Sequence, residues 1–289
     1  MMKKNLFLIA LVFIFYASFA QAEYKGSYGS VTDSRDGYTY KTVKIGEQEW
    51  FAENLRTTKF QDGSDLPNGD DADLQSIDEE ARIFWFNPNG DAKNVATYGR
   101  LYTFHAAIKG ICPTGWHAAE DLDWAILEMA LGMSAADATG NHFHNSRGED
   151  KKVGDKLKAT SKDWPESTGT NESGFNILPA GYRSLEEGGH PKWDYFGERA
   201  YFLTTTLGPK GKVYNKTNPL DRTIRRNFEA NRGRIMRDSN IPVGYGFAVR
   251  CVKGDNYPLD RQMEIREKGG QKEGNKGGKK EDDDRSGKK

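Results

Sequence analysis

Long apolar runs are missing from this chain after its first 22 residues, so no later segment is expected to cross a membrane. The one apolar stretch, residues 6–16, follows two lysines and precedes Ala20-Gln21-Ala22, a small-x-small pattern typical of signal-peptide cleavage. We therefore predict that residues 1–22 are a signal peptide, cleaved before Glu23. A retained anchor is the alternative, which the shortness of the run disfavours. The mature protein is then expected outside the cytoplasm: secreted, at the cell surface or in the periplasm.

Cysteine is also scarce, because Cys112 and Cys251 are the only two. They are too distant in the sequence to form a Cys-x-x-Cys metal or redox motif. Two cysteines in an exported protein favour a disulfide, and two separate free thiols are the alternative.

The sequence has no excess of positive charge, since 42 Lys and Arg balance 42 Asp and Glu. Basic residues outnumber acidic ones in the leader and near the C-terminus, which leaves the part between them mildly acidic. Binding to a phosphate backbone requires a basic face, so nucleic acid is not an expected partner.

Composition divides the remainder of the chain into three parts. Gly, Lys, Glu and Asp fill residues 255–289, which cannot bury enough apolar surface to offset their conformational entropy, so we expect a disordered charged tail. Residues 23–30 are expected to be a short linker. Residues 31–254 are then one domain, large enough to bury a substantial core.

Alternating patterns predict a domain made mainly of strands. Strands are expected over residues 38–45, 49–55, 82–86, 175–179, 201–206, 213–218, 223–228 and 244–252. The best helix is predicted over 119–131, apolar on two faces, with shorter helices over 100–108 and 153–160. The Gly-rich segment 182–198 is predicted to be a long loop, and 134–152 an irregular insertion. The fold class is therefore α+β with irregular antiparallel strands, few helices and long loops.

Several short blocks follow one another in a specific order. They are Asp36–Gly46, Gln48–Leu55, Tyr98–Tyr102, Cys112–His117, Leu178–Arg183 and Val249–Val252. This ordered set resembles the Fibrobacter succinogenes major paralogous domain family over about residues 31–254. The resemblance implies a C-type-lectin-like fold, shared with sulfatase-modifying-factor domains, in which a disulfide ties an early helix to the last strand. Here that disulfide would join Cys112 to Cys251.

Fold likeness does not determine function. The sugar and calcium signatures of true C-type lectins (Glu-Pro-Asn, Gln-Pro-Asp, Trp-Asn-Asp) are absent, as is a catalytic cysteine arrangement. The leading interpretation is a non-enzymatic binding or adhesion module for polysaccharide or a cell-surface protein. The alternatives are an enzyme related to sulfatase-modifying factors, and a structural outer-surface protein without a small ligand.

Candidate binding residues gather in the segment 182–198, which corresponds in lectin-like folds to a variable long loop where ligands are often held. The rings of Trp193 and Tyr195 could stack on sugars, and Arg183 and Asp194 could hydrogen-bond hydroxyl groups. The alternative is that these aromatic residues fold back as a small core under the loop.

The sequence indicates a metal site less strongly than a binding site. Asp70, Asp71 and Asp73 could bind calcium, which prefers oxygen ligands, although a solvated acidic loop is the alternative. No other cofactor is expected. His142 and His144 lack a third ligand that would indicate a metal site.

Three further patterns are interpreted as structural. His117 has no acidic or thiol neighbour in the sequence that suggests a catalytic triad, so a structural role is expected. Ala118 and Ala119 stand where the family has Pro and a Ser or Thr cap, so the following helix is expected to lack its usual cap. A basic cluster is expected to be a solvated face: Arg225, Arg226, Arg232, Arg234 and Arg237.

Overall fold

The computed structural model describes residues 24–74, 77, 82–140, 147–185, 191–208 and 222–256. The expected signal peptide, most of the expected tail, the expected strand 213–218, His142 and His144 lie outside these residues. In the part of the chain described, no helix combines the length and apolar character needed to cross a membrane.

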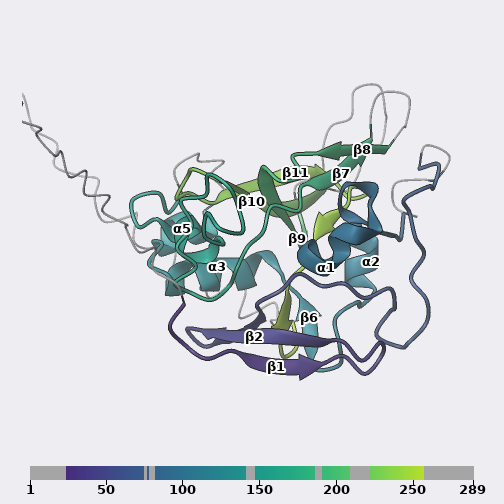
Figure 1. The fold of residues 1–289 in the computed structure, drawn as a ribbon, viewed down its shortest axis with the longest axis horizontal. Helices are drawn as coiled ribbons and strands as arrows, with labels where there is room; N and C mark the ends of the chain where they lie inside the picture. The colour runs from purple at the N-terminus through teal and green to yellow at the C-terminus, as the bar shows by residue number, and fades with distance from the viewer. Residues whose placement is uncertain are drawn as a thin grey trace, which may run out of the picture.

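One sheet lies along the base of the molecule in the view of Figure 1. Its strand order is β1-β2-β3-β13-β6, all antiparallel. The strands are β1 (Gly29–Thr32), β2 (Thr39–Ile45), β3 (Gln48–Phe51), β6 (Trp116–Ala118) and β13 (Cys251–Lys253). The last strand therefore lies in the middle of a sheet begun by the first three.

A second sheet has the order β11-β10-β9-β12-β5-β4, in which only the β12–β9 pair is parallel. Its strands are β4 (Trp85–Phe86), β5 (Leu101–Tyr102), β9 (Arg199–Leu207), β10 (Arg222–Glu229), β11 (Met236–Pro242) and β12 (Phe247–Ala248). A hairpin of β7 (Tyr182–Leu185) and β8 (Pro191–Asp194) lies beside it.

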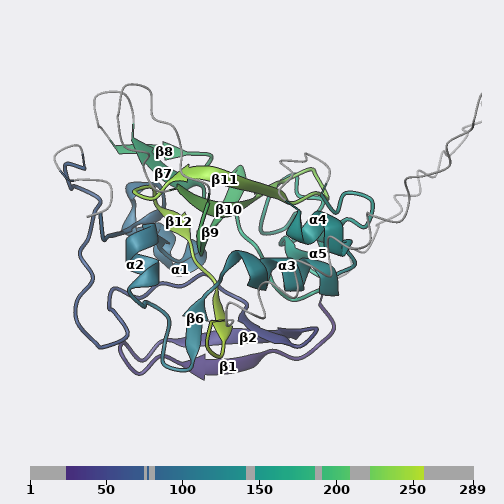
Figure 2. The same ribbon diagram turned by 180° about the vertical axis from the view of Figure 1, so that it is seen from behind.

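The helices flank the space between the two sheets, with α3, α4 and α5 to one side and α1 and α2 to the other (Figures 1 and 2). They are α1 (Val95–Tyr98), α2 (Phe104–Ile108), α3 (Asp121–Ala130), α4 (Ala135–Thr139) and α5 (Val153–Leu157), with two 3-10 turns, η2 (Pro88–Gly90) and η3 (Ala92–Asn94). Mostly antiparallel sheets with few, short helices confirm the α+β class.

Strand β9 separates two hydrophobic cores, because successive side chains point to opposite faces. The core toward α3 contains Trp50, Trp124, Phe175, Phe202 and Phe228. The core toward α2 contains Phe51, Tyr102, Trp116, Tyr201 and Phe247. Phe202 and Tyr201, adjacent in β9, thus belong to different cores.

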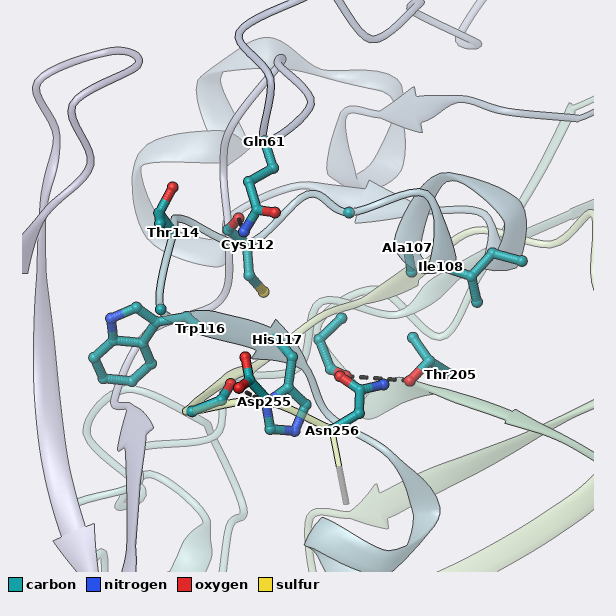
Figure 3. Close-up of a pocket in the computed structure, with 14 residues that line it drawn as sticks. Gln61, Ala107, Ile108, Cys112, Thr114, Trp116, His117, Thr205, Asp255 and Asn256 are labelled. Atoms are coloured by element: carbon teal, nitrogen blue, oxygen red, sulfur yellow. Dashed lines mark hydrogen bonds between the residues drawn. The ribbon is translucent and has the colours of Figure 1, made fainter. Parts of the chain in front are cut away.

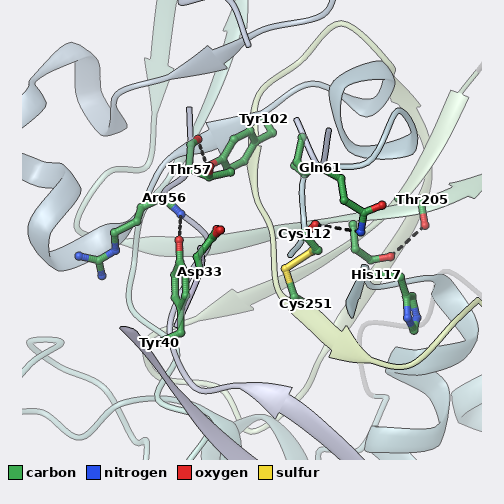
Figure 4. Close-up of a disulfide and its surroundings, with 12 residues drawn as sticks. Asp33, Tyr40, Arg56, Thr57, Gln61, Tyr102, Cys112, His117, Thr205 and Cys251 are labelled. Atoms are coloured by element: carbon green, nitrogen blue, oxygen red, sulfur yellow. Dashed lines mark hydrogen bonds between the residues drawn. A yellow bond between two sulfur atoms is a disulfide. The ribbon is translucent and has the colours of Figure 1, made fainter. Parts of the chain in front are cut away.

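The predicted disulfide is confirmed, with 5.9 Å between the Cα atoms of Cys112 and Cys251 (Figure 4). Cys251 is the first residue of β13, as expected. Cys112 lies in the segment between α2 and β6, and β6 is the strand that leads into α3. Both cysteines are buried, so the bond joins the middle of the chain to its last strand inside the second core.

The start of α3 differs from expectation. In place of a missing cap, the backbone N–H of Glu120 donates to Oδ2 of Asp123 at 2.7 Å. An acid three residues into the helix thus satisfies a backbone donor just before it.

Several predicted elements were wrong in detail. The segment 182–198 contains the β7–β8 hairpin instead of being all loop. Residues 100–108 divide into strand β5 and helix α2. Residues 175–179 form no strand, only an isolated bridge between Ile177 and Lys158.

The expectation of a solvated basic face was wrong for Arg226 and Arg237, which are both buried. Arg226 donates to Oε1 of Glu128 at 2.7 Å and to Oδ1 of Asp121 at 2.6 Å. Arg237 pairs with Oδ2 of Asp121 at 2.7 Å. Buried charges require such partners, and helix α3 supplies both carboxylates.

Candidate functional site

The β7–β8 hairpin separates the four predicted binding residues onto two faces. Tyr182 pairs with Asp194 across the hairpin, and Arg183 pairs with Trp193. Since successive side chains of a strand alternate in direction, the two pairs lie on opposite faces of the hairpin, and Tyr182 packs against the second core.

Arg183 and Trp193 pack inward against Phe86. The guanidinium carbon of Arg183 lies 4.5 Å from the ring centroid of Phe86, and Trp193 meets the same ring edge-on at 6.4 Å. Arg183 is 0% exposed, and its guanidinium nitrogens have no hydrogen-bond partner among the residues that the structure describes. Burial lowers the pKa of Arg183 to about 10.

Aromatic side chains gather between the other face of the hairpin and the neighbouring sheet. We call this set the tyrosine surface: Tyr182, Tyr195, Tyr201, Tyr245 and Phe247. Tyr201 and Phe247 are its buried base, Tyr182 and Tyr245 are half-buried, and Tyr195 is exposed. The ring of Tyr182 is nearly parallel to those of Tyr195, Tyr245 and Phe247, at 24°, 21° and 26°, with centroids 5.5–6.2 Å apart. Tyr195 is 41% exposed, so the cluster reaches solvent at the predicted binding residue.

Two arginines contact these rings, and each is paired with a carboxylate. Arg225 lies 4.7 Å from the centroid of Tyr201 and forms an ion pair with Asp238 at 3.0 Å. Arg199 lies 4.7 Å from the centroid of Tyr195 and pairs with Glu229 at 3.1 Å. The surface therefore combines cation–π contacts with little net charge.

Tyr182 keeps its hydroxyl proton under ordinary conditions. Burial, assisted by the negative charge of Asp194, raises the pKa of Tyr182 to about 12. A neutral phenol both donates and accepts hydrogen bonds, as a ligand rich in hydroxyl groups requires. Asp194 also accepts a hydrogen bond from the hydroxyl of Ser184 at 2.7 Å.

The predicted calcium loop lies close to the inner face of the hairpin. Asp70 accepts hydrogen bonds from the backbone and side-chain nitrogens of Asn87, at 2.9 and 2.6 Å, and its charge acts on Arg183. Burial raises the pKa of Asp70. Asp71 and Asp73 are exposed. Among the described residues, no three His, Cys, Asp or Glu side chains are arranged to hold a metal ion.

A separate cleft of about 590 Å³ opens beside the disulfide (Figure 3). The end of α2, Cys112, residues 114–118, Thr205 of β9 and residues 254–256 line it, together with Gln61. Figure 3 shows Gln61 and Thr114 on one side of this cleft and His117 and Asn256 on the other. This cleft is not visible in the sequence, because its walls come from four distant segments.

In the folded protein, His117 of this cleft has an acidic neighbour, Asp123. Its Nε2 lies 2.9 Å from Oδ2 of Asp123, and its Nδ1 lies 2.8 Å from the carbonyl oxygen of Gly254. Burial favours the neutral ring, but the hydrogen bond and charge of Asp123 outweigh it and raise the pKa of His117. Both partners accept hydrogen bonds, so both contacts are satisfied only when both ring nitrogens carry protons. Neither nitrogen is then free to act as a catalytic base.

The expectation that His117 lacks an acidic neighbour was therefore wrong. The sequence contained one usable signal, since Asp123 falls in the first turn of the helix that follows the strand of His117. A side chain there points back toward that strand.

One comparison with known proteins gave a match. A family model described as the Fibrobacter succinogenes major domain matches residues 43–253, from within β2 to the end of β13. No curated protein and no solved structure matches the chain.

Proposed function

The chain belongs to the Fibrobacter succinogenes major domain family, and from this premise we propose that it is an exported, non-enzymatic binding module for carbohydrate. Its architecture is proposed to be C-type-lectin-like, which agrees with a disulfide that ties the last strand to the middle of the chain. The leader pattern and the disulfide support a location outside the cytoplasm, secreted or at the cell surface.

The observation that carries this proposal is the tyrosine surface. The exposed ring of Tyr195, with the half-buried rings of Tyr182 and Tyr245 beside it, offers an aromatic face to the apolar C–H faces of sugar rings. The hydroxyl of Tyr182 and the carboxylate of Asp194 lie at the same place and match the hydroxyl groups of a sugar.

The charge around this surface favours a neutral polysaccharide. Arg225 and Arg199 are already paired with Asp238 and Glu229, so an anionic ligand would have to displace a carboxylate from a guanidinium. A neutral ligand can use the rings and the hydroxyl groups without disturbing either pair.

The enzyme alternative requires a reactive thiol. Both cysteines of the chain are joined in the disulfide, so this alternative would first need the bond to be reduced. The structural-protein alternative predicts no binding to any glycan, and the binding experiments with polysaccharides described next test it.

Affinity electrophoresis and pull-down against neutral and acidic polysaccharides test the proposal. Tyr195→Asn removes the exposed ring, and Asn tolerates the φ of 57° at this position. We expect Tyr195→Asn to weaken binding by about fivefold, since one aromatic contact contributes about 1 kcal/mol. Tyr28→Asn is the matched control, because Tyr28 is 38% exposed and lies outside the tyrosine surface.

Retention on neutral polysaccharide that falls with Tyr195→Asn and not with Tyr28→Asn would support this function. No retention on any polysaccharide, or equal retention of both variants and the natural protein, would contradict it.

A further inference from the structure

The cleft beside the disulfide contains polar groups that the fold does not use. The hydroxyl of Thr114 and the carboxylate of Asp255 have no hydrogen-bond partner in the described part of the chain. Gln61 donates through Nε2 to the carbonyl of Cys112 at 3.3 Å, and Asn256 donates through Nδ2 to Glu120 at 2.8 Å. These contacts fix both amides and leave each amide oxygen to accept from a ligand.

An apolar rim accompanies these polar groups. Ile108, at the end of α2, is 51% exposed, and Ala107 lies beside it on the wall of the cleft. Amides, a hydroxyl and a carboxylate next to an aliphatic side chain match a ligand with hydroxyl groups on its edge and C–H groups on its face.

The charges of the cleft exclude an anionic ligand. The imidazolium of His117 is paired with Asp123, so its charge is already balanced. The charged side chain of Asp255 that remains on the wall is negative and repels a carboxylate or phosphate.

The walls of the cleft are held in place on both sides. The N–H of Gly254 donates to the carbonyl of Gly115 at 2.8 Å, and the carbonyl of Gly254 accepts from His117. On the opposite wall, the backbone N–H of Gln61 donates to Gly110 at 2.9 Å. A cleft of about 590 Å³ with walls fixed in this way is within the usual size range for small-molecule sites.

We infer that this cleft is a second carbohydrate site, which takes a short neutral oligosaccharide. The inference rests on the proposed function only for the class of ligand, since the cleft and the tyrosine surface share no residue. Thr205 in the cleft and Tyr201 in the tyrosine surface lie on the same face of β9, about 13 Å apart along the strand. Two sites so close would let one polysaccharide chain contact both and gain avidity.

Two variants test the cleft without threatening the fold. Thr114→Val removes one hydroxyl at nearly constant volume, and Asn256→Ala removes one amide; both residues are exposed. The probes are soluble neutral trisaccharides of glucose, xylose and mannose, with trigalacturonic acid as the anionic counterpart. Calorimetry gives the affinity, and amide chemical shifts give the location of binding.

We expect one of the neutral trisaccharides to shift the amides of residues 114–118 and 254–256. We expect Thr114→Val and Asn256→Ala each to weaken that binding about fivefold, with no effect of Tyr195→Asn. Shifts confined to the tyrosine surface, or affinity unchanged in both cleft variants, would overturn the cleft site and leave the proposed function standing. A preference for trigalacturonic acid would also overturn it. Absence of binding at both places would reject the site together with the proposed function.

Discussion

Nε2 of His117 lies 2.9 Å from Oδ2 of Asp123, and this contact joins strand β6 to the first turn of α3. The same carboxylate accepts from the backbone of Glu120, and its other oxygen accepts from Gln48 of β3 at 3.3 Å. The other ring nitrogen of His117 holds Gly254, just after the last strand. One histidine and one buried aspartate therefore connect the base sheet, the main helix and the end of the domain.

The stability of this protein should fall as pH rises above neutrality. The pKa of His117 is raised in the folded state above its value of about 6.5 in the unfolded chain. The stabilisation is therefore fully present below about pH 6.5 and is lost as pH rises through the folded pKa. Thermal unfolding between pH 5 and 9 should show this loss in the natural protein and not in His117→Gln.

The pH effect can be assigned to the His117 ring directly. Asp123→Asn removes the charge that raises its pKa, so the ring should titrate at lower pH in that variant, as measured by the imidazole NMR signals. An unchanged titration would show that Asp123 does not control the protonation of His117.

Loss of the disulfide should weaken the fold without abolishing it. Cys112 and Cys251 are 139 residues apart, and closing so long a loop contributes about 4–5 kcal/mol on the chain-entropy model. The double variant Cys112→Ser with Cys251→Ser should lose this amount in urea unfolding and keep native circular dichroism, because two cores remain. An unfolded double variant in water would contradict this prediction.

The buried carboxylate of Glu128 should be among the most sensitive positions in the chain. It is 0% exposed and pairs with both Arg147 and Arg226. Glu128→Gln leaves these two buried guanidinium groups without that charge, and we expect a loss of about 3–5 kcal/mol. Glu47→Gln is the control, because the Lys44–Glu47 pair lies on the surface with the Glu47 side chain 97% exposed.

Urea unfolding of Glu128→Gln and Glu47→Gln measures the loss in the free energy of unfolding that each substitution causes. We expect Glu47→Gln to change the free energy of unfolding by less than about 0.5 kcal/mol. Equal effects of the two substitutions would show that the buried network does not stabilise the protein more than a surface pair.

Local patterns predicted the elements whose periodicity is strong. Strand β2, helix α3 and strand β9 fall where the sequence placed them, because each has several apolar residues at the spacing of its element. The disulfide followed from the cysteine count and the family resemblance. Strand β11 was missed because its residues, Met236–Pro242, are mostly polar and have no apolar alternation.

Contacts between distant segments were not visible in the sequence. Arg226 was expected to be solvated, although it alternates with Ile224 and Phe228 and so shares their buried face. Its partners, Asp121 and Glu128, lie about a hundred residues earlier, and only the packing of α3 on the sheet brings them together. The cleft at His117 is hidden from sequence for the same reason.

Arg183 and Arg226 allow a direct comparison of how two buried arginines affect the stability of this protein. Both are 0% exposed. Arg226 has two carboxylate partners, whereas the guanidinium of Arg183 has Phe86 beside it and no hydrogen-bond partner in the described ranges. Arg226→Met removes one of the two arginine partners from each of two buried carboxylates, Asp121 and Glu128, and should cost about 3–5 kcal/mol.

Arg183→Met should behave differently, because a flexible apolar side chain keeps the contact with Phe86 and removes a buried guanidinium that has no hydrogen-bond partner among the described residues. We expect its free energy of unfolding to stay within about 1 kcal/mol of the natural protein, or to rise. Urea unfolding of the two variants, prepared side by side, measures the difference. If Arg183→Met loses as much stability as Arg226→Met, then the guanidinium of Arg183 has a partner in solution, and the inner face of the hairpin is a site of ionic pairing and not of simple packing.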